Sequence, residues 1–313
     1  MGLNGNLFTS YLKEVYLPQA VKTVFQNDVW FNQPFIEVVP PASCPAGPHI
    51  NLILDYAVST NAEVYVQGAP APSAYTMSDI RAYFTKDFFQ ESVKIHGDTL
   101  AMLANGAGSN VQENAVQKSL MQGLMNLKAL MSSTFLTDLA AQVDSSTAYS
   151  DASLSRSTYA CASQETGSIS ALARADLIDA LEGLQAGTYG PVPQLDDLLW
   201  LMPPNQHTNL ANLQGAAAYS EFSVDSSNMG PIDSGVKFRT NTFEGIPILQ
   251  VPGMTTTELY LVKKSATKIY FHNDFNMVQK DLAEWADSWL ITCGANLVVS
   301  DPRCCVKLTD ITA

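Results

Sequence analysis

Charged side chains are scarce in this chain of 313 residues, of which only 15% are Asp, Glu, Lys or Arg, whereas about a quarter is usual in soluble proteins. Basic residues are the scarcest: 17 Lys and Arg stand against 30 Asp and Glu, which leaves a formal net charge of -13. Because nucleic acids are bound through basic patches that face the phosphates, this balance argues against binding of DNA or RNA by direct phosphate contact. An acidic wall that repels DNA is still compatible with a container.

The low charge content also favours extensive contact with other chains, because charged groups are depleted at the centres of protein interfaces. Adaptation to temperature or to expression is the alternative explanation. Hydrophobic residues make up 46% of the chain, which is enough for a real core in one large domain or two modest ones.

Signals for membranes, secretion and disulfide bonds are missing as well. No run of 18 apolar residues occurs, and the first residues show no basic stretch followed by an apolar one. We therefore expect neither a transmembrane helix nor a signal peptide. The five cysteines are odd in number and show no CxxC spacing, which argues against a disulfide framework or a zinc site and indicates an intracellular, reducing origin.

Motifs of enzymes and cofactor sites are absent. The chain contains no HExxH, GxSxG, GxxxxGK[ST] or GxGxxG, so we predict no catalytic, cofactor-binding or metal-binding residues. The histidines have no companions at metal-ligand spacing; they are His49, His96, His207 and His272. His96 and His272 are expected in strands as hydrogen-bonded structural residues, and Asp196 and Asp197 in a solvated loop.

A long β-hairpin is the first element that the sequence predicts. Apolar residues alternate with others from residue 50 to 58 and again from residue 80 to about 95, the period of a strand with one buried face. Between them, a cluster rich in Gly and Pro at residues 67–73 indicates a reversal of the chain. Two strands of roughly fifteen residues make a ribbon about 50 Å long. Because an isolated ribbon is marginal in water, we expect it to lie on something else, which hints at assembly.

A long helix is predicted to follow, beginning near Ser109 or Asn110 and ending near Val143. Its apolar residues repeat at spacings of three and four; they are Val116, Leu120, Leu124, Leu127, Met131, Phe135 and Leu139. Such a stripe is typical of a helix with one buried face, here roughly 45 Å long. Met121 and Met125 broaden the stripe, which favours core packing over an adaptable binding groove. Gly123 allows a bend or a close backbone contact.

The remaining segments mix both types of element. Residues 1–48 are apolar but broken by prolines, with a short helix ending at Pro18, and they are expected to drape over a body, their own or a neighbour's. Helices are predicted at 172–184 and after Pro204, a mobile loop at 214–240, and strands at 198–202, 243–251, 259–262, 269–271, 289–299 and 306–308. Pro247 is expected on an edge strand. Because helices and strands do not alternate regularly, the fold class is α+β.

This order of parts resembles the major capsid protein of tailed bacteriophages, the Hong Kong 97-like fold. Besides the hairpin and the long helix, the segments that carry the resemblance are 175–181, 199–204 and the Gly245-Ile246-Pro247-Ile248 turn. The resemblance implies an N-terminal arm at 1–48, a hairpin called the E-loop at 49–96, a peripheral domain with a spine helix at 97–160, completed by about 260–300, and an axial domain at 161–259, completed by 301–313.

The resemblance further implies a structural protein of the virion capsid, assembled in the host cytoplasm, that forms an icosahedral shell around a double-stranded DNA genome. Its implied partners are other copies of itself in hexamers and pentamers and a portal protein, with non-specific contact to packaged DNA and no membrane. Either a separate scaffold protein takes part or assembly has no scaffold, and the shell is held by buried surface or by a decoration or cement protein. Lys86 and Lys94 are the only lysines of the hairpin and lie far from its tip, so we expect no covalent cross-link between subunits.

Apolar and tip residues of the arm and hairpin are the predicted contacts between subunits: Leu7, Tyr11, Tyr16, Trp30, Phe31, Tyr65, Gln67, Pro70, Pro72, Tyr75 and Phe84. Within the same fold, an encapsulin-type nanocompartment shell is the alternative function. A soluble hydrolase and another virion protein, such as a receptor-binding protein, are alternatives from different classes.

Overall fold

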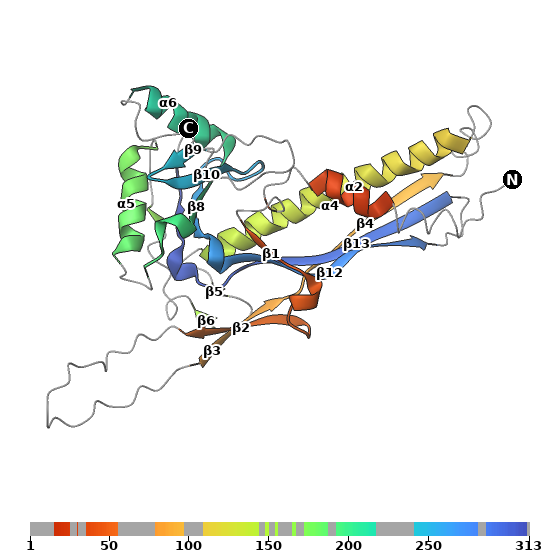
Figure 1. Cartoon of the computed structure of the whole chain (residues 1–313), viewed down its shortest axis with the longest axis horizontal. Helices are drawn as coiled ribbons and strands as arrows, with labels where there is room; N and C mark the ends of the chain where they lie inside the picture. Colours follow the sequence, from red (N-terminus) through yellow and green to blue (C-terminus); the bar gives the residue numbers. More distant parts are fainter. Residues whose placement is uncertain are drawn as a thin grey trace.

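In its described part, the computed structural model of the chain contains two larger β-sheets, two small two-stranded sheets and one long helix that runs beside the larger sheets (Figure 1). The structure describes residues 16–25, 30, 36–55, 79–96, 109–143, 148–149, 154–155, 165–166, 172–186, 192–216, 241–280 and 286–311. The predicted turn at 67–73 and most of the predicted loop at 214–240 lie outside these residues.

A four-stranded sheet and helix α4 form one half of the molecule. In sheet order the strands are β1 (Glu37–Val39), β12 (Thr267–Lys280), β13 (Ala286–Val299) and β4 (Phe88–His96). β12, β13 and β4 are antiparallel neighbours, whereas β1 adds in parallel. Every second residue of β13, including Trp289, Ile291 and Cys293, is buried in the main core, as the period of a strand with one covered face requires.

Helix α4 (Ser109–Val143) confirms the predicted helix at both ends. All seven residues of the predicted stripe are buried in the main core together with the inward residues of the four-stranded sheet. A Cβ atom on Gly123 would lie 2.5 Å from Cγ2 of Val93 on β4. The close contact of α4 with β4 at this position therefore depends on glycine.

Helix α2 (Leu17–Phe25) packs across α4 through the same core. The sequence pattern did not predict this helix, in which Pro18 lies in the first turn. A proline is tolerated there, since the first N–H groups of a helix have no partner within it. The helix predicted to end at Pro18 lies mostly outside the described residues.

The second half of the molecule is a six-stranded sheet. In sheet order its strands are β7 (Glu165–Thr166), β14 (Val306–Leu308), β11 (Leu259–Lys263), β8 (Leu198–Met202), β10 (Ile246–Gln250) and β9 (Asn241–Phe243). Helices α5 (Arg174–Gln185) and α6 (Pro204–Ala216) contribute buried leucines to the core on one face. These elements confirm the predicted helices and the predicted strands at 198–202, 259–262 and 306–308.

Strand β8 shows why residues 198–202 form an unbroken apolar run. Leu198, Trp200 and Met202 pack into the core under α5 and α6, whereas Leu199 and Leu201 pack into the main core with α4. A strand that is covered on both faces has no polar side in its sequence.

The position of Pro247 differs from the sequence expectation. β10 lies inside the sheet, between β8 and β9, and not at its edge. Pro247 pairs with Thr242 of β9, and the pairing of β10 with β8 begins one residue later, at Ile248. The missing N–H of proline therefore falls before the second ladder begins.

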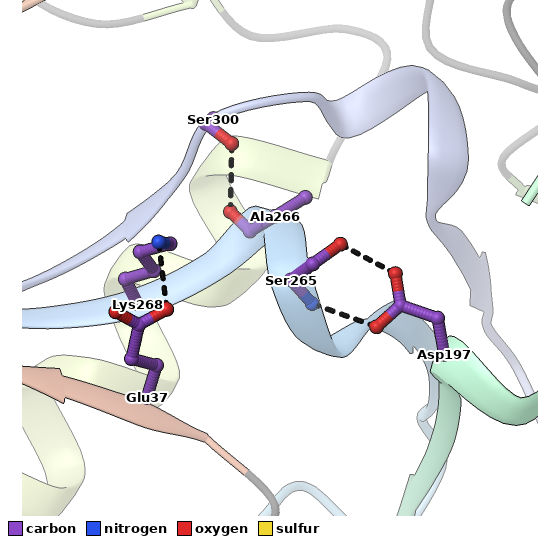
Figure 2. Close-up of polar contacts among 6 residues, drawn as sticks. All are labelled: Glu37, Asp197, Ser265, Ala266, Lys268 and Ser300. Carbon is purple, nitrogen blue, oxygen red and sulfur yellow. Dashed lines mark hydrogen bonds and ion pairs between the residues drawn. The ribbon is translucent and has the colours of Figure 1, made fainter.

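The chain passes between the two larger sheets from β11 to β12 and again from β13 to β14. Figure 2 shows polar contacts at and beside these two connections. The backbone N–H and hydroxyl of Ser300, after β13, donate to the carbonyl oxygen of Ala266, before β12, at 2.7 and 3.0 Å. The Asp197 carboxylate, expected in a solvated loop, accepts hydrogen bonds from the backbone N–H and hydroxyl of Ser265, the former at 3.0 Å. Lys268 pairs with Glu37 at 2.6 Å. The hydrogen bonds from Ser300 to Ala266 thus connect these two segments with each other.

The second strand predicted for the hairpin is divided between two sheets, and residues 56–78, toward the hairpin tip, lie outside the described part of the chain. Strands β2 (His49–Asp55) and β3 (Asp79–Thr85) form a two-stranded antiparallel sheet outside both larger sheets (Figure 1). Residues 88–96, predicted to extend the ribbon to residue 96, instead form β4 and pair with β13. Phe89 and Val93 are the reason, because their side chains fill the core beneath α4. The same alternation of residues suits both positions.

Short elements complete the described chain. They are the two-stranded sheet of β5 (Ala148–Tyr149) and β6 (Leu154–Ser155) and the 3-10 helices η2 (Pro41–Ser43), η3 (Leu195–Asp197), η4 (Lys264–Ala266) and η5 (Pro302–Cys304).

Candidate contact surfaces

Large apolar side chains are exposed at three places on the described surface. They are Phe88 and Val278 on the four-stranded sheet, Met125 and Leu130 on the outer side of α4, and Val192 and Leu195 before β8. Single exposed apolar residues are ordinary, so the decisive question is which of them belong to a face that the chain itself leaves uncovered.

The four-stranded sheet turns one face to α4 and the other away from it. Phe88 pairs with Gly294 and Val278 with Leu290, one residue out of phase with the buried positions Phe89 and Ile291, so Phe88 and Val278 share the second face. Phe88 is 70% exposed and Val278 47%. Both side chains therefore lie on a sheet face that the described helices do not cover.

A ring stack organises the middle of this second face. The imidazole of His272 lies directly over Gly294, where any Cβ would overlap the ring. The ring of Phe88 meets this imidazole edge-on, with the centroids 4.8 Å apart. Burial, and secondly the nearby charge of Lys86, lowers the pKa of His272. The stack thus presents a neutral, largely apolar surface at neutral pH.

The base of the hairpin covers one end of the same face. Ile50 and Phe84 are cross-strand partners in the hairpin, and their side chains pack on Val298 of β13, which is buried beneath them. The ammonium group of Lys86 donates to the carbonyl oxygen of Pro45 at 2.7 Å. The packing of Ile50 and Phe84 on Val298 thus attaches the root of the hairpin to the second face.

A groove of about 650 Å³ lies between α2, α4 and the turn after β10. Met121 and Met125 line it, and the Lys128 ammonium group donates to the carbonyl oxygen of Val24 beside it at 3.0 Å. Met131 is instead fully buried. The methionines of α4 thus divide between the core and an open groove, although the sequence favoured core packing for all of them.

Two polar residues of α4 face inward, and the sequence analysis missed both. The side-chain amide of Gln142 donates to the carbonyl oxygen of Leu297 at 2.9 Å and accepts from the N–H of Val299 at 2.7 Å, so it pairs with β13 as a strand would. Burial, and secondly the charge of Asp87, raises the pKa of Asp138 to about 7. Asp138 lies three residues after Phe135, and Gln142 lies four residues after Asp138. This spacing places both polar groups on the apolar stripe, and it was the signal available in the sequence.

The structure describes three of the predicted contact residues. Trp30 is 1% exposed and packs edge-on against Phe135 at 6.2 Å, and Phe84 is buried at the hairpin root. Both side chains pack in the core of their own chain, and a contact of either with a neighbouring copy stays a prediction. The Tyr16 hydroxyl donates to the carbonyl oxygen of Gln117 at 2.9 Å, so this half-buried ring is also held by its own helix α4.

The other predicted contact residues lie outside the described part of the chain: Leu7, Tyr11, Phe31, Tyr65, Gln67, Pro70, Pro72 and Tyr75. Within the described part, no group of three or more His, Cys, Asp or Glu side chains is placed to hold a metal ion. No helix of that part is long and apolar enough to cross a membrane.

Comparison with known proteins links this architecture to viral shells. No family model and no curated relative matches the sequence. The capsid asymmetric unit of cyanophage A-1(L) is similar over 91% of this chain and 96% of the other, with a TM-score of 0.64 and 14% identity. The chain has the fold of a phage capsid protein.

Two further structures extend this likeness of the capsid fold. The capsid of cyanophage P-SCSP1u matches with a TM-score of 0.56 and 13% identity over 89% of this chain and 86% of the other. A virus-like particle from Pyrococcus furiosus matches with a TM-score of 0.51 and 10% identity over 95% and 97%. At these identities the capsid fold is shared although the sequences have diverged.

Proposed function

We propose that this chain is a major capsid protein that self-assembles into the icosahedral shell of a tailed, double-stranded DNA phage and encloses its genome. The observation that carries the proposal is the likeness to the cyanophage A-1(L) capsid, because it extends over 91% of this chain and 96% of the other. A likeness of that extent spans nearly the whole chain and is not limited to one common motif.

The chemistry of the surface supports the same function. In the described part of the chain, β2 and β3 pair only with each other, and a two-stranded ribbon is marginally stable in water without further packing. Phe88 and Val278 add apolar area on the adjacent sheet face, and its burial would favour association by about 25 cal/mol per Å². A second copy of the chain is the occupant that the capsid fold suggests for this face.

The family pattern then divides the chain as follows. We assign residues 1–48 to the N-terminal arm and the hairpin from residue 49 to 85 to the E-loop. α4 as spine helix and the four-stranded sheet belong to the peripheral domain, and the six-stranded sheet with α5 and α6 to the axial domain. Predicted contact residues outside the described part remain candidates for contacts between copies.

Partners follow from this role. Copies of the chain form the hexamers and pentamers of the lattice, a portal protein occupies one vertex, and a separate scaffold and a decoration or cement protein complete assembly in the host cytoplasm. The net charge of -13 allows packaged DNA to slide along the wall with only non-specific contact. No membrane takes part in this proposal.

A nanocompartment shell of the encapsulin type is the second candidate, because the similarity to the virus-like particle from Pyrococcus furiosus extends over 95% of this chain. The two candidates differ in content. A capsid is encoded beside portal and terminase genes and contains DNA in the virion, whereas a nanocompartment is encoded beside a cargo enzyme and contains protein.

The test is electron microscopy of the purified full-length protein together with analytical ultracentrifugation. We expect closed, uniform particles, or capsomers that close when a scaffold is added. A protein that stays a monomer of 33.9 kDa at all concentrations, with and without the neighbouring gene products, would contradict the shell function and favour the soluble hydrolase.

A further inference from the structure

The joint between the hairpin and the body is only two residues long. Strand β3 ends at Thr85, where it pairs with His49 of β2, and β4 begins at Phe88, where it pairs with Gly294 of β13. Within Lys86 and Asp87 the chain therefore exchanges one pairing partner for another. The direction in which the hairpin leaves the body depends on how these two residues are held.

One buried side chain of β13 holds this joint. The amide oxygen of Asn296 accepts a hydrogen bond from the backbone N–H of Asp87 at 3.1 Å. Its amide nitrogen donates to the carbonyl oxygen of Thr85 at 3.0 Å and to the Asp87 carboxylate at 2.8 Å. Asn296 is 4% exposed although it is polar. We refer to these three hydrogen bonds as the Asn296 clamp.

The clamp takes over where the ladder between β4 and β13 stops. That ladder ends at Gly294, and two residues further on the Asn296 amide offers the donor and the acceptor that a strand would have offered. Asparagine is the side chain that supplies both groups at this length. Leaving the part-buried N–H and carbonyl groups of the joint unpaired carries a desolvation penalty, so the joint has a preferred geometry.

Lys86 holds the joint from the other side. Its backbone N–H donates to the carbonyl oxygen of Pro48 at 3.2 Å and its ammonium group to that of Pro45 at 2.7 Å. These bonds tie the joint to the turn before β2 but not to the sheet. In the described structure, the four-stranded sheet forms hydrogen bonds with the side chain and backbone of the joint through Asn296.

We propose that Asn296 is the positioning residue that sets the direction in which the β2–β3 hairpin leaves the body, and with it the uniformity of the assembled shell. This inference rests on the proposed shell function. A closed lattice requires every hairpin to reach the same place on its neighbour. Without the clamp, the joint would lose its hydrogen bonds to β13, and the packing of Ile50 and Phe84 on Val298 would have to set the direction of the hairpin.

Asn296→Asp tests the clamp with almost no change in size. The carboxylate still accepts from the Asp87 N–H, but its second oxygen faces the Thr85 carbonyl and the Asp87 carboxylate, where the wild type has a donor. Asp87→Asn in the same chain restores a donor to that pair. Asn209→Asp is the matched control, because Asn209 is a half-buried amide of α6, away from the second face, and donates to the side-chain oxygen of Gln206 at 3.2 Å.

Two readouts separate positioning from general stability. We expect N296D to lower the fraction of uniform closed particles in electron micrographs, and to speed hydrogen exchange of the amides at 80–87 by about tenfold or more, as for a lost buried hydrogen bond to a charged group. Exchange in β8 should stay unchanged. The D87N/N296D variant should recover most of both effects, and N209D should match the wild type.

The outcomes distinguish the two levels of the account. Wild-type protein that forms no particles contradicts the shell function, whereas uniform particles of both wild type and N296D overturn the role of Asn296. Equal losses in N296D and D87N/N296D overturn it as well, because they indicate a structural defect without the clamp's chemistry. Should N296D fail to fold, Asp87→Ala, which removes one acceptor only, must reduce uniformity relative to the wild type, and unchanged uniformity contradicts the proposal.

Discussion

The two sheets of this chain differ in how completely the chain covers them. The six-stranded sheet contributes β8, buried along its whole length, to a core on each of its faces. The four-stranded sheet buries one face under α4 and leaves Phe88 and Val278 exposed on the other. The six-stranded sheet is therefore covered around β8 on both faces by its own chain, whereas the four-stranded sheet keeps a face that a second molecule can cover.

The largest effect on the subunit is expected where the chain covers both faces. Trp200 is fully buried in β8 and packs edge-on against Phe243 with the ring centroids 6.4 Å apart. Trp200→Ala should lower the free energy of unfolding by about 3–5 kcal/mol, the cost of an aromatic cavity, measured by urea unfolding of unassembled subunits. Val192→Ala, at an exposed residue, is the control. A loss below about 1 kcal/mol for W200A would show that this core is loosely packed.

A smaller loss of stability is expected at Gly294, where the ring of His272 packs tightly on the second face. Gly294→Ala places a methyl group within the ring of His272, and such overpacking costs about 1–3 kcal/mol in thermal unfolding experiments. Removing the ring in the double variant H272A/G294A should recover part of the loss. If G294A alone were neutral, the stack of Phe88, His272 and Gly294 would not be a rigid part of the face.

Stability should also depend on pH through α4. The pKa of Asp138 is raised from 3.8 to about 7, so between these values the folded chain holds a proton that the unfolded chain has released, and stability falls as the pH rises through this window. Asp138→Asn removes the ionisation. Its stability relative to the wild type should rise by about 1–2 kcal/mol from about pH 4 to about pH 8, after allowance for partial exposure.

Urea unfolding of the unassembled subunit across that pH range is the measurement. Asp179→Asn, at an exposed Asp of α5, is the matched control and should leave the pH dependence of the wild type in place. A D138N variant that keeps the wild-type pH dependence would assign it to other groups.

The smallest effect on the subunit is expected at Phe88. Phe88→Ser should change the free energy of unfolding by no more than about 0.5 kcal/mol, because the side chain is exposed. It should nevertheless reduce the yield of particles in ultracentrifugation, since apolar area is lost from the uncovered face. Gln90→Ser, at the next exposed position of β4, is the control. Normal assembly of F88S would remove Phe88 from the contact surface.

Local patterns in the sequence were enough to predict α4 and β8. A stripe with a period of 3.6 residues specifies a helix whatever lies against it, and Leu198 to Met202 form an apolar run between turn signals. Residues 88–96 show the limit, because a period of two residues suits a hairpin and a sheet edge equally. The choice of partner depended on β13, about 200 residues later in the chain, which no local pattern reports.

The polar contacts were hidden from the sequence for the same reason. Asn296 and Asp87 are separated by 209 positions, and neither belongs to a motif. Trp30 lies in a proline-broken segment that was expected to pack on its own body or on a neighbour's, and in the structure it packs in the core of its own chain. Only Gln142 and Asp138 left a visible signal, as polar residues on an apolar stripe.

The central claim is that the uncovered face of the four-stranded sheet, beside the hairpin root, is completed by another copy of the chain. An electron cryomicroscopy reconstruction of the assembled particle tests it directly. We predict density from a neighbouring subunit over Phe88 and Val278, with the second face buried throughout the lattice. A shell in which this face stays open to solvent, or a protein that remains a monomer, would contradict the claim.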